Sequence, residues 1–176
     1  MPLFRSAVAN TTVLIAFAQI NRMDVLRSLV GIIHVPSQVY VEVITPEVKA
    51  AVGKGVNEGW IKVETLSSDE MEECNGYAME IDPNNPEKHV GEAAAITLHQ
   101  RIKPDVLILD ELKPRQVARS LGIQHIVGTL GLFLAAQTEG LLTARDIKTY
   151  IDILVSKGTK ISKELRDKIL SEAKKK

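Results

Sequence analysis

The pattern that most constrains this chain is a short apolar run that ends on a polar residue and is followed by a helical segment. Val106–Leu109 runs directly into Asp110 and Glu111, and the earlier run Ala7–Ala9 ends in the same way on Asn10. Such a run is typical of a parallel strand that is buried on both faces and carries its last side chain to the carboxyl edge of the sheet. Ligands of open α/β sheets bind at that edge. We therefore expect a functional site where these strands end.

The alternation of strand and helix extends along most of the chain. The expected strands are 7–10, 31–35, 61–65, 106–109 and 124–127. The expected helices are 12–19, 24–29, 37–44, 46–59, 90–101, 114–121, 129–139, 144–156 and 162–173. Segment 37–44 also alternates like a strand, but Pro36 before it favours a helix. This order predicts a three-layer α/β/α fold with a central parallel sheet of about five strands and C-terminal helices.

Three helix starts carry recognisable caps, and one segment breaks the pattern. Asp24 and Ser162 are expected N-caps, and Thr143 with Asp146 approximates a capping box. Segment 66–89 combines many acidic residues with the sequence Pro-Asn-Asn-Pro. We expect that segment to be a partly ordered insertion over one face of the sheet.

Composition limits both the architecture and the kinds of partner. With 176 residues, 45% of them hydrophobic, the chain is large enough for one core. We expect an α/β domain over 1–142 and, over 143–176, a helical extension of the same domain. Lys and Arg together number 22, as do Asp and Glu, so binding of a nucleic acid has to rest on a local patch.

The expected compartment is the cytoplasm. Cys74 is the single cysteine and has no partner for an internal disulfide, and residues 1–6 do not resemble the start of a signal peptide. The longest apolar stretch, 126–136, is interrupted by glycines and is shorter than the ~20 residues of a membrane span.

Several polar side chains should converge at the carboxyl edge. Asn10 and Asp110 end strands there, and Thr129 follows the last strand. Glu92 lies in the first turn of a helix that begins at that edge. Glu42 lies on the helix after the second strand, within reach of the edge if that helix leans over the sheet. Carboxylates at short range repel each other unless a cation neutralises them. Mg²⁺ or Mn²⁺ fits such oxygen ligands, and the chemistry that follows is hydrolysis of a phosphodiester.

Five segments resemble the PIN-domain family, and in particular a prokaryotic subgroup of PIN-like proteins. They are 7–14, 36–43, 91–96, 107–111 and 127–131, with Ala118 and Gly122 between the last two; the resemblance covers 6 to about 142, and 157–162 in the tail. It implies a metal-dependent ribonuclease that cuts single-stranded RNA, often the toxin of a toxin–antitoxin pair and usually a homodimer or higher homo-oligomer.

The resemblance also implies roles for individual residues. It makes Asp110, Glu92 and Glu42 catalytic and, with Asn10, ligands of Mg²⁺ or Mn²⁺, and it places Asn10, Thr12 and Thr129 among the substrate contacts. Arg115 begins near the same edge as Asp110 and is a further candidate contact for a phosphate backbone, with a solvated helix face as the competing interpretation. Two positions depart from the family. Asn10 stands where the family has Asp, and Thr129 where many active members have another Asp or polar residue. An amide oxygen ligates without charge, so weaker Mg²⁺ binding is expected, and the alternative is a catalytically weakened module that binds RNA or a protein partner.

Structural roles compete with these functional ones. Asp110 could cap the helix after its strand, Glu92 could be a first-turn acid, and Asn10 could be a turn residue. Thr12 and Thr129 could be helix caps, and Glu111 is expected to be a solvated neighbour.

Other functional classes fit the residues less well. The four histidines have no shared metal-ligand spacing, so we do not expect a zinc site. We expect these histidines to have structural roles instead. Glycine-rich nucleotide motifs are absent from the sequence. A receiver domain would need an acidic pair after its first strand, where this chain has Asn10-Thr11-Thr12.

In the last helix, Leu165 and Ile169 are predicted to pack at least partly against another chain, because their apolar stripe is narrow.

Overall fold

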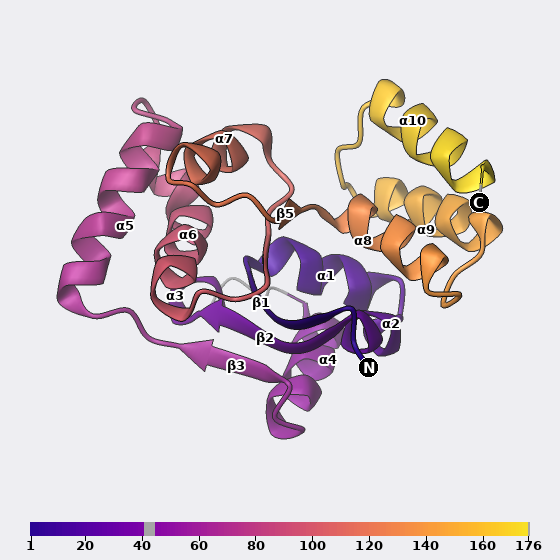
Figure 1. The fold of residues 1–176 in the computed structure, drawn as a ribbon, viewed down its shortest axis with the longest axis horizontal. Coiled ribbons are helices and arrows are strands. Elements are labelled where there is room, and N and C mark those ends of the chain that lie inside the picture. The colour runs from indigo at the N-terminus through magenta and orange to yellow at the C-terminus, as the bar shows by residue number, and fades with distance from the viewer. Residues whose placement is uncertain (41–44, 176) are drawn as a thin grey trace.

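The computed structural model describes residues 1–40 and 45–175. Its centre is a sheet of five parallel strands, in the order β3-β2-β1-β4-β5, with helices on both faces (Figure 1). The strands are β1 (Phe4–Ala9), β2 (Val30–Pro36), β3 (Ile61–Glu64), β4 (Val106–Ile108) and β5 (Ile126–Val127). The predicted three-layer α/β/α fold with C-terminal helices is confirmed, and each predicted strand lies at its expected place.

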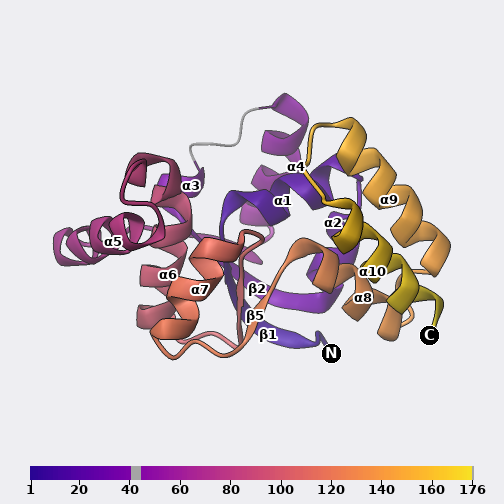
Figure 2. The same cartoon turned by 90° about the horizontal axis from the view of Figure 1, so that it is seen from above.

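The helices form two layers that Figure 2 shows on opposite sides of the sheet. One layer contains α1 (Thr11–Gln19), α2 (Met23–Leu29), α4 (Pro46–Asn57), α8 (Thr129–Thr138), α9 (Ala144–Ser156) and α10 (Lys163–Lys174). The other contains α5 (Ser68–Ile81), α6 (Val90–Ile102) and α7 (Leu112–Ser120). Two short elements complete the described chain: α3 (Ser37–Tyr40) and the 3-10 helix η1 (Pro86–His89).

The apolar runs of β1 and β4 are uninterrupted because each of these strands contributes side chains to two cores, one on each face of the sheet. Side chains alternate between the faces of a strand, so Ala7 and Ala9 pack with α1 and α8 while Val8 packs with α6. In the same way Ile108 enters the first core and Leu107 the second. A run that is apolar at every position is what a sheet covered on both faces requires.

The segment 66–89 differs from its prediction. Instead of a partly ordered insertion it contains α5, a helix of 14 residues that begins with a capping box formed by Ser67 and Glu70. Cys74, Ala78 and Ile81 of this helix are buried against α6. Its acidic residues lie mostly on the outer side, so composition alone concealed a short apolar face.

The C-terminal helices pack on the chain's own α8 layer. Both predicted caps are confirmed, at Thr143 with Asp146 and at Ser162. Ile169 is only 6% exposed within the main core, so the prediction that it needs another chain for burial is wrong. Asp24 does not cap α2; it pairs with Arg22 at 3.0 Å. Among the described residues, no helix has the length and apolar character needed to cross a membrane.

Candidate functional site

Asn10 and Glu92 meet at the carboxyl edge of the sheet. Asn10 follows β1 and is the N-cap residue of α1, while Glu92 lies in the first turn of α6. The Asn10 amide nitrogen donates a hydrogen bond of 3.4 Å to Oε1 of Glu92. An N-cap asparagine usually accepts a bond from its own helix, but Oδ1 of Asn10 has no such bond. The residue is 5% exposed, and this buried oxygen has no hydrogen-bond partner in the described chain.

Asp110 lies at the same edge, after the neighbouring strand β4. Its two carboxylate oxygens accept hydrogen bonds from Thr129, one from the backbone N–H at 2.7 Å and one from the hydroxyl at 2.8 Å. Thr129 is the first residue of α8, so Asp110 binds the N-terminus of α8 rather than that of α7, which follows it in sequence. Gly128 permits this approach, because a Cβ there would lie 2.9 Å from Oδ1 of Asp110. Each oxygen keeps a lone pair for a further ligand.

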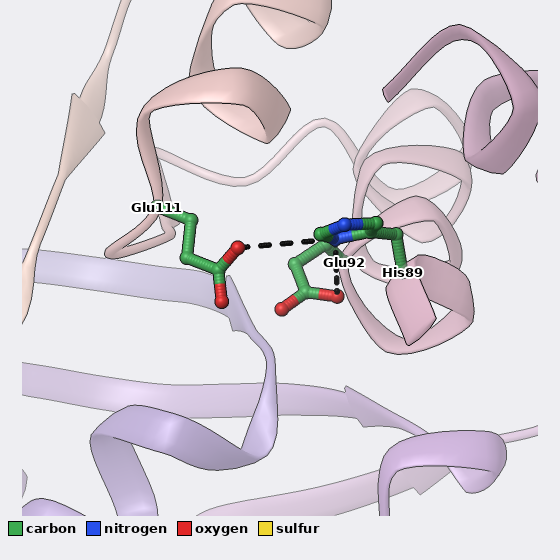
Figure 3. Close-up of side chains that lie close together, drawn as sticks. All are labelled: His89, Glu92 and Glu111. Atoms are coloured by element: carbon green, nitrogen blue, oxygen red, sulfur yellow. Dashed lines mark ion pairs between the residues drawn. The ribbon is translucent and has the colours of Figure 1, made fainter. Parts of the chain in front are cut away.

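A third group lies where α6 and α7 begin. Nδ1 of His89 is 3.9 Å from Oε2 of Glu92 and 3.8 Å from Oε2 of Glu111, and Figure 3 shows the imidazole facing both carboxylates. On the other side of the ring, Nε2 is 3.9 Å from Oδ2 of Asp82. Ligand atoms of His89, Glu92 and Glu111 all lie within 4.8 Å of one another.

Asp82 remains ionised beside His89. Its pKa is held below the ordinary value, first by a hydrogen bond from the backbone N–H of Asn84 and also by the charge of Lys113, 3.8 Å away. Asp82 and Lys113 therefore form a charged pair beside the His89 ring.

A cleft of about 850 Å³ opens beside Asp110. Thr12, Arg115 and Thr129 line it near the carboxyl edge, and Lys157, Lys160 and Lys168 line it near α10; we call these three lysines the lysine rim. Burial lowers the pKa of Arg115, as does the charge of Arg119, while Asp110 opposes the shift. One terminal nitrogen of Arg115 donates to the carbonyl oxygen of Ile126, whereas its Nε has no hydrogen-bond partner among the described residues. A guanidinium with an unused donor is suited to bind an anion.

Comparison with known families decides the identity of the fold. A family model described as a PIN domain matches residues 6–175. The chain belongs to the PIN-domain family. No curated protein and no solved structure matches it. The PIN-domain match includes the C-terminal helices, and so extends beyond the segments that carried the sequence resemblance. PIN domains belong to a nuclease superfamily and generally use a divalent metal ion.

The residues of this PIN domain fit such an ion. Hard divalent cations bind carboxylate and amide oxygens, and the edge offers Glu92, Asp110 and the unpaired Oδ1 of Asn10. A buried amide oxygen without a partner is costly, and a bound cation would satisfy it. The donor set is therefore chemically suited to Mg²⁺ or Mn²⁺.

The structure places the site residues expected from the sequence in two groups at the carboxyl edge. Asn10 contacts Glu92, and Asp110 contacts Thr129. Thr12, Asp110, Arg115 and Thr129 line one cleft. Glu42 lies outside the described residues. His89 was missed as a site residue, although its position three residues before Glu92, at the start of the same helix, was a usable signal.

Proposed function

We propose that this PIN domain is a metal-dependent endoribonuclease that cuts single-stranded RNA in the cytoplasm. The observation that carries the proposal is the buried, unpaired Oδ1 of Asn10 beside Glu92 at the carboxyl edge of the sheet. Glu92, Asp110, Asn10 and Glu42 would hold Mg²⁺ or Mn²⁺. A cation bound there would supply Lewis-acid stabilisation of the phosphate and an activated water.

The cleft supports RNA as the substrate. Arg115 lines the cleft beside Asp110, and the lysine rim adds positive charges near α10. Phosphates bind arginine and lysine side chains, and a partly buried guanidinium can hold two phosphate oxygens at once. Arg115 and the lysine rim would therefore position the strand, while Asp110, which lines the same cleft, would face the phosphate to be cut.

The alternative is a module that binds RNA or a protein partner without cutting. Asn10 favours it, because this side chain brings no charge to the metal site and its amide nitrogen already bonds to Glu92. Binding and cleavage therefore have to be measured separately.

The test uses a labelled single-stranded RNA and its DNA counterpart, with Mn²⁺ or Mg²⁺. Cleavage of the RNA should fall by about 100-fold or more in Glu92→Gln, because stabilisation of several kcal/mol is lost with the metal ligand. Glu87→Gln is the matched control, since Glu87 is exposed just before the same helix. Binding without cleavage in the wild type would favour the alternative, and absence of both would reject the nuclease and the RNA-binding form of the alternative.

We also propose that the chain associates through α10, as a homodimer or with an antitoxin-like partner. Leu165 is 43% exposed and lines the cleft, so an apolar side chain is available at its rim. Truncation before α10 would expose the core that Ile169 completes, so a point variant is the better test. Leu165→Glu should lower the mass found by light scattering, whereas Val155→Glu, at 41% exposure on α9, should not. An equal mass for all three proteins would exclude self-association through Leu165.

A further inference from the structure

His89 is spaced from its carboxylates in a way that a direct ion pair does not explain. Elsewhere in the chain, Nδ1 of His34 closes to 2.8 Å on Oε1 of Glu64. Nδ1 of His89 stays 3.8 to 3.9 Å from Glu111 and Glu92 and makes no hydrogen bond, although its side chain is only 14% exposed. Two carboxylates thus face one imidazole nitrogen without closing on it.

That spacing is suited to an ion between the three side chains. Ligand atoms about 2.1 Å from one cation lie at most about 4.2 Å apart. The two measured separations from His89 satisfy that limit, and all three ligand atoms lie within 4.8 Å of one another. Glu111 is 59% exposed, so its side chain is free to make the small remaining movement.

Two neighbouring groups have the features of a supported metal site. Metal-bound histidines commonly present their second ring nitrogen to a carboxylate; Asp82 lies on that side of His89, with Oδ2 3.9 Å from Nε2, which is longer than a hydrogen bond. The amide of Asn10 donates to the same Glu92 carboxylate, the residue is 5% exposed, and its Oδ1 is unpaired. That oxygen points to a ligand independently of the acidic groups.

We propose that His89, Glu92 and Glu111 bind a first-row transition-metal ion and that the imidazole makes this site select Mn²⁺ over Mg²⁺. The inference deepens the proposed nuclease function, since Glu92 belongs to both sites. Mg²⁺ prefers oxygen ligands and keeps its waters, whereas a nitrogen ligand favours transition metals over it. His89 is the residue that separates this donor set from one made only of oxygens.

The experiment follows Mn²⁺ on the full chain by electron paramagnetic resonance, without RNA. The wild type should bind Mn²⁺ with a hyperfine coupling to a nitrogen nucleus and should require excess Mg²⁺ to release it. His89→Gln should lose the nitrogen coupling and bind Mn²⁺ about 10-fold or more weakly, while its affinity for Mg²⁺ changes less than about 2-fold. His125→Gln, which alters an exposed imidazole, should match the wild type.

Three results would overturn the proposal: no nitrogen coupling in the wild type, unchanged Mn²⁺ binding in His89→Gln, or an equal loss of Mn²⁺ and Mg²⁺ affinity. Circular dichroism of His89→Gln shows whether the variant is folded. If it is not, Glu111→Gln replaces it, because this exposed ligand can change without loss of core packing, and Mn²⁺ affinity should again fall about 10-fold. Nitrogen coupling without RNA cleavage would reject the proposed nuclease function but support the metal site at His89. RNA cleavage that depends on Glu92, without nitrogen coupling, would support the nuclease function but reject the metal site at His89.

Discussion

Asp110 and Glu92 both lie at the carboxyl edge of the sheet, but their carboxylates have different surroundings. Asp110 accepts hydrogen bonds of 2.7 and 2.8 Å from Thr129, at the N-terminus of α8. Glu92 accepts a longer bond of 3.4 Å from Asn10 and lies 3.9 Å from His89. The first carboxylate therefore helps to hold a helix against the sheet in addition to the ligand role proposed for it, whereas the second has the longer contacts that the proposed metal site requires. One edge of the sheet thus carries a tightly held acid and a more loosely held one.

The largest effect that tests the difference between these two carboxylates is the loss of folding stability on replacement of Asp110. In the presence of EDTA, Asp110→Ala should lower the free energy of unfolding by about 3 kcal/mol, because two hydrogen bonds to a charged acceptor disappear and the end of α8 loses its cap. Urea denaturation followed by circular dichroism measures this. Glu111→Ala, next in sequence and 59% exposed, should stay within about 0.5 kcal/mol of the wild type. Equal losses in the two variants would contradict a structural role for Asp110.

A smaller effect is expected at Asn10. With EDTA present, Asn10→Asp should lower the free energy of unfolding by about 1 to 2 kcal/mol, because a carboxylate oxygen replaces the amide that donates to Glu92 and the two charges repel. Added Mn²⁺ should reverse that loss, since a ligand of the native state adds about 2.7 kcal/mol at 100 times its Kd. Thermal melts with EDTA and with Mn²⁺ show both changes.

Asn10→Ala is the control for that experiment, because it removes Oδ1 without adding charge. Its stabilisation by Mn²⁺ should be weaker than that of the wild type. A rise in metal-free stability for Asn10→Asp would place Asn10 outside the acidic group.

The smallest effect compares the two histidines without metal. His34→Gln should cost about 1 kcal/mol, because its hydrogen bond of 2.8 Å to Glu64 is lost. His89→Gln should cost less than about 0.5 kcal/mol, because Nδ1 of His89 makes no hydrogen bond that could be lost. Parallel urea titrations in EDTA measure the difference. A larger cost at His89 would mean that its imidazole stabilises the fold directly.

Periodicity in the sequence was sufficient for nearly all of the secondary structure. The apolar runs at β1 and β4 and the spaced apolar residues of α8 and α9 depend on neighbours a few positions away, and they were predicted correctly. The failure was α5, where three small or medium apolar residues, Cys74, Ala78 and Ile81, form the buried face among many acids. Such a narrow face becomes decisive only when α6 is present to cover it.

The sequence predicted which residues end strands at the carboxyl edge, but not the contacts that those residues make. The ends of β1 and β4 placed Asn10 and Asp110 at one edge, because parallel strands share a carboxyl end. Thr129, the hydrogen-bond partner of Asp110, is 19 positions away in the sequence. The sequence pattern had instead indicated that Asp110 could cap the helix directly after its strand. The position of Glu111 near His89 depends likewise on how α6 and α7 start beside each other.

Patterns in the amino-acid sequence were sufficient to predict the layered α/β/α fold, the PIN-domain resemblance and the edge at which Asn10 and Asp110 lie. Those properties follow from burial, which is encoded in the spacing of apolar residues along each strand and helix. The tertiary structure alone decided that Asp110 is held by α8, that Oδ1 of Asn10 is buried without a partner, and that His89 faces two carboxylates. A hydrogen bond or a metal ligand requires atoms placed to within a few tenths of an ångström, and the packing of helices distant in sequence sets those positions.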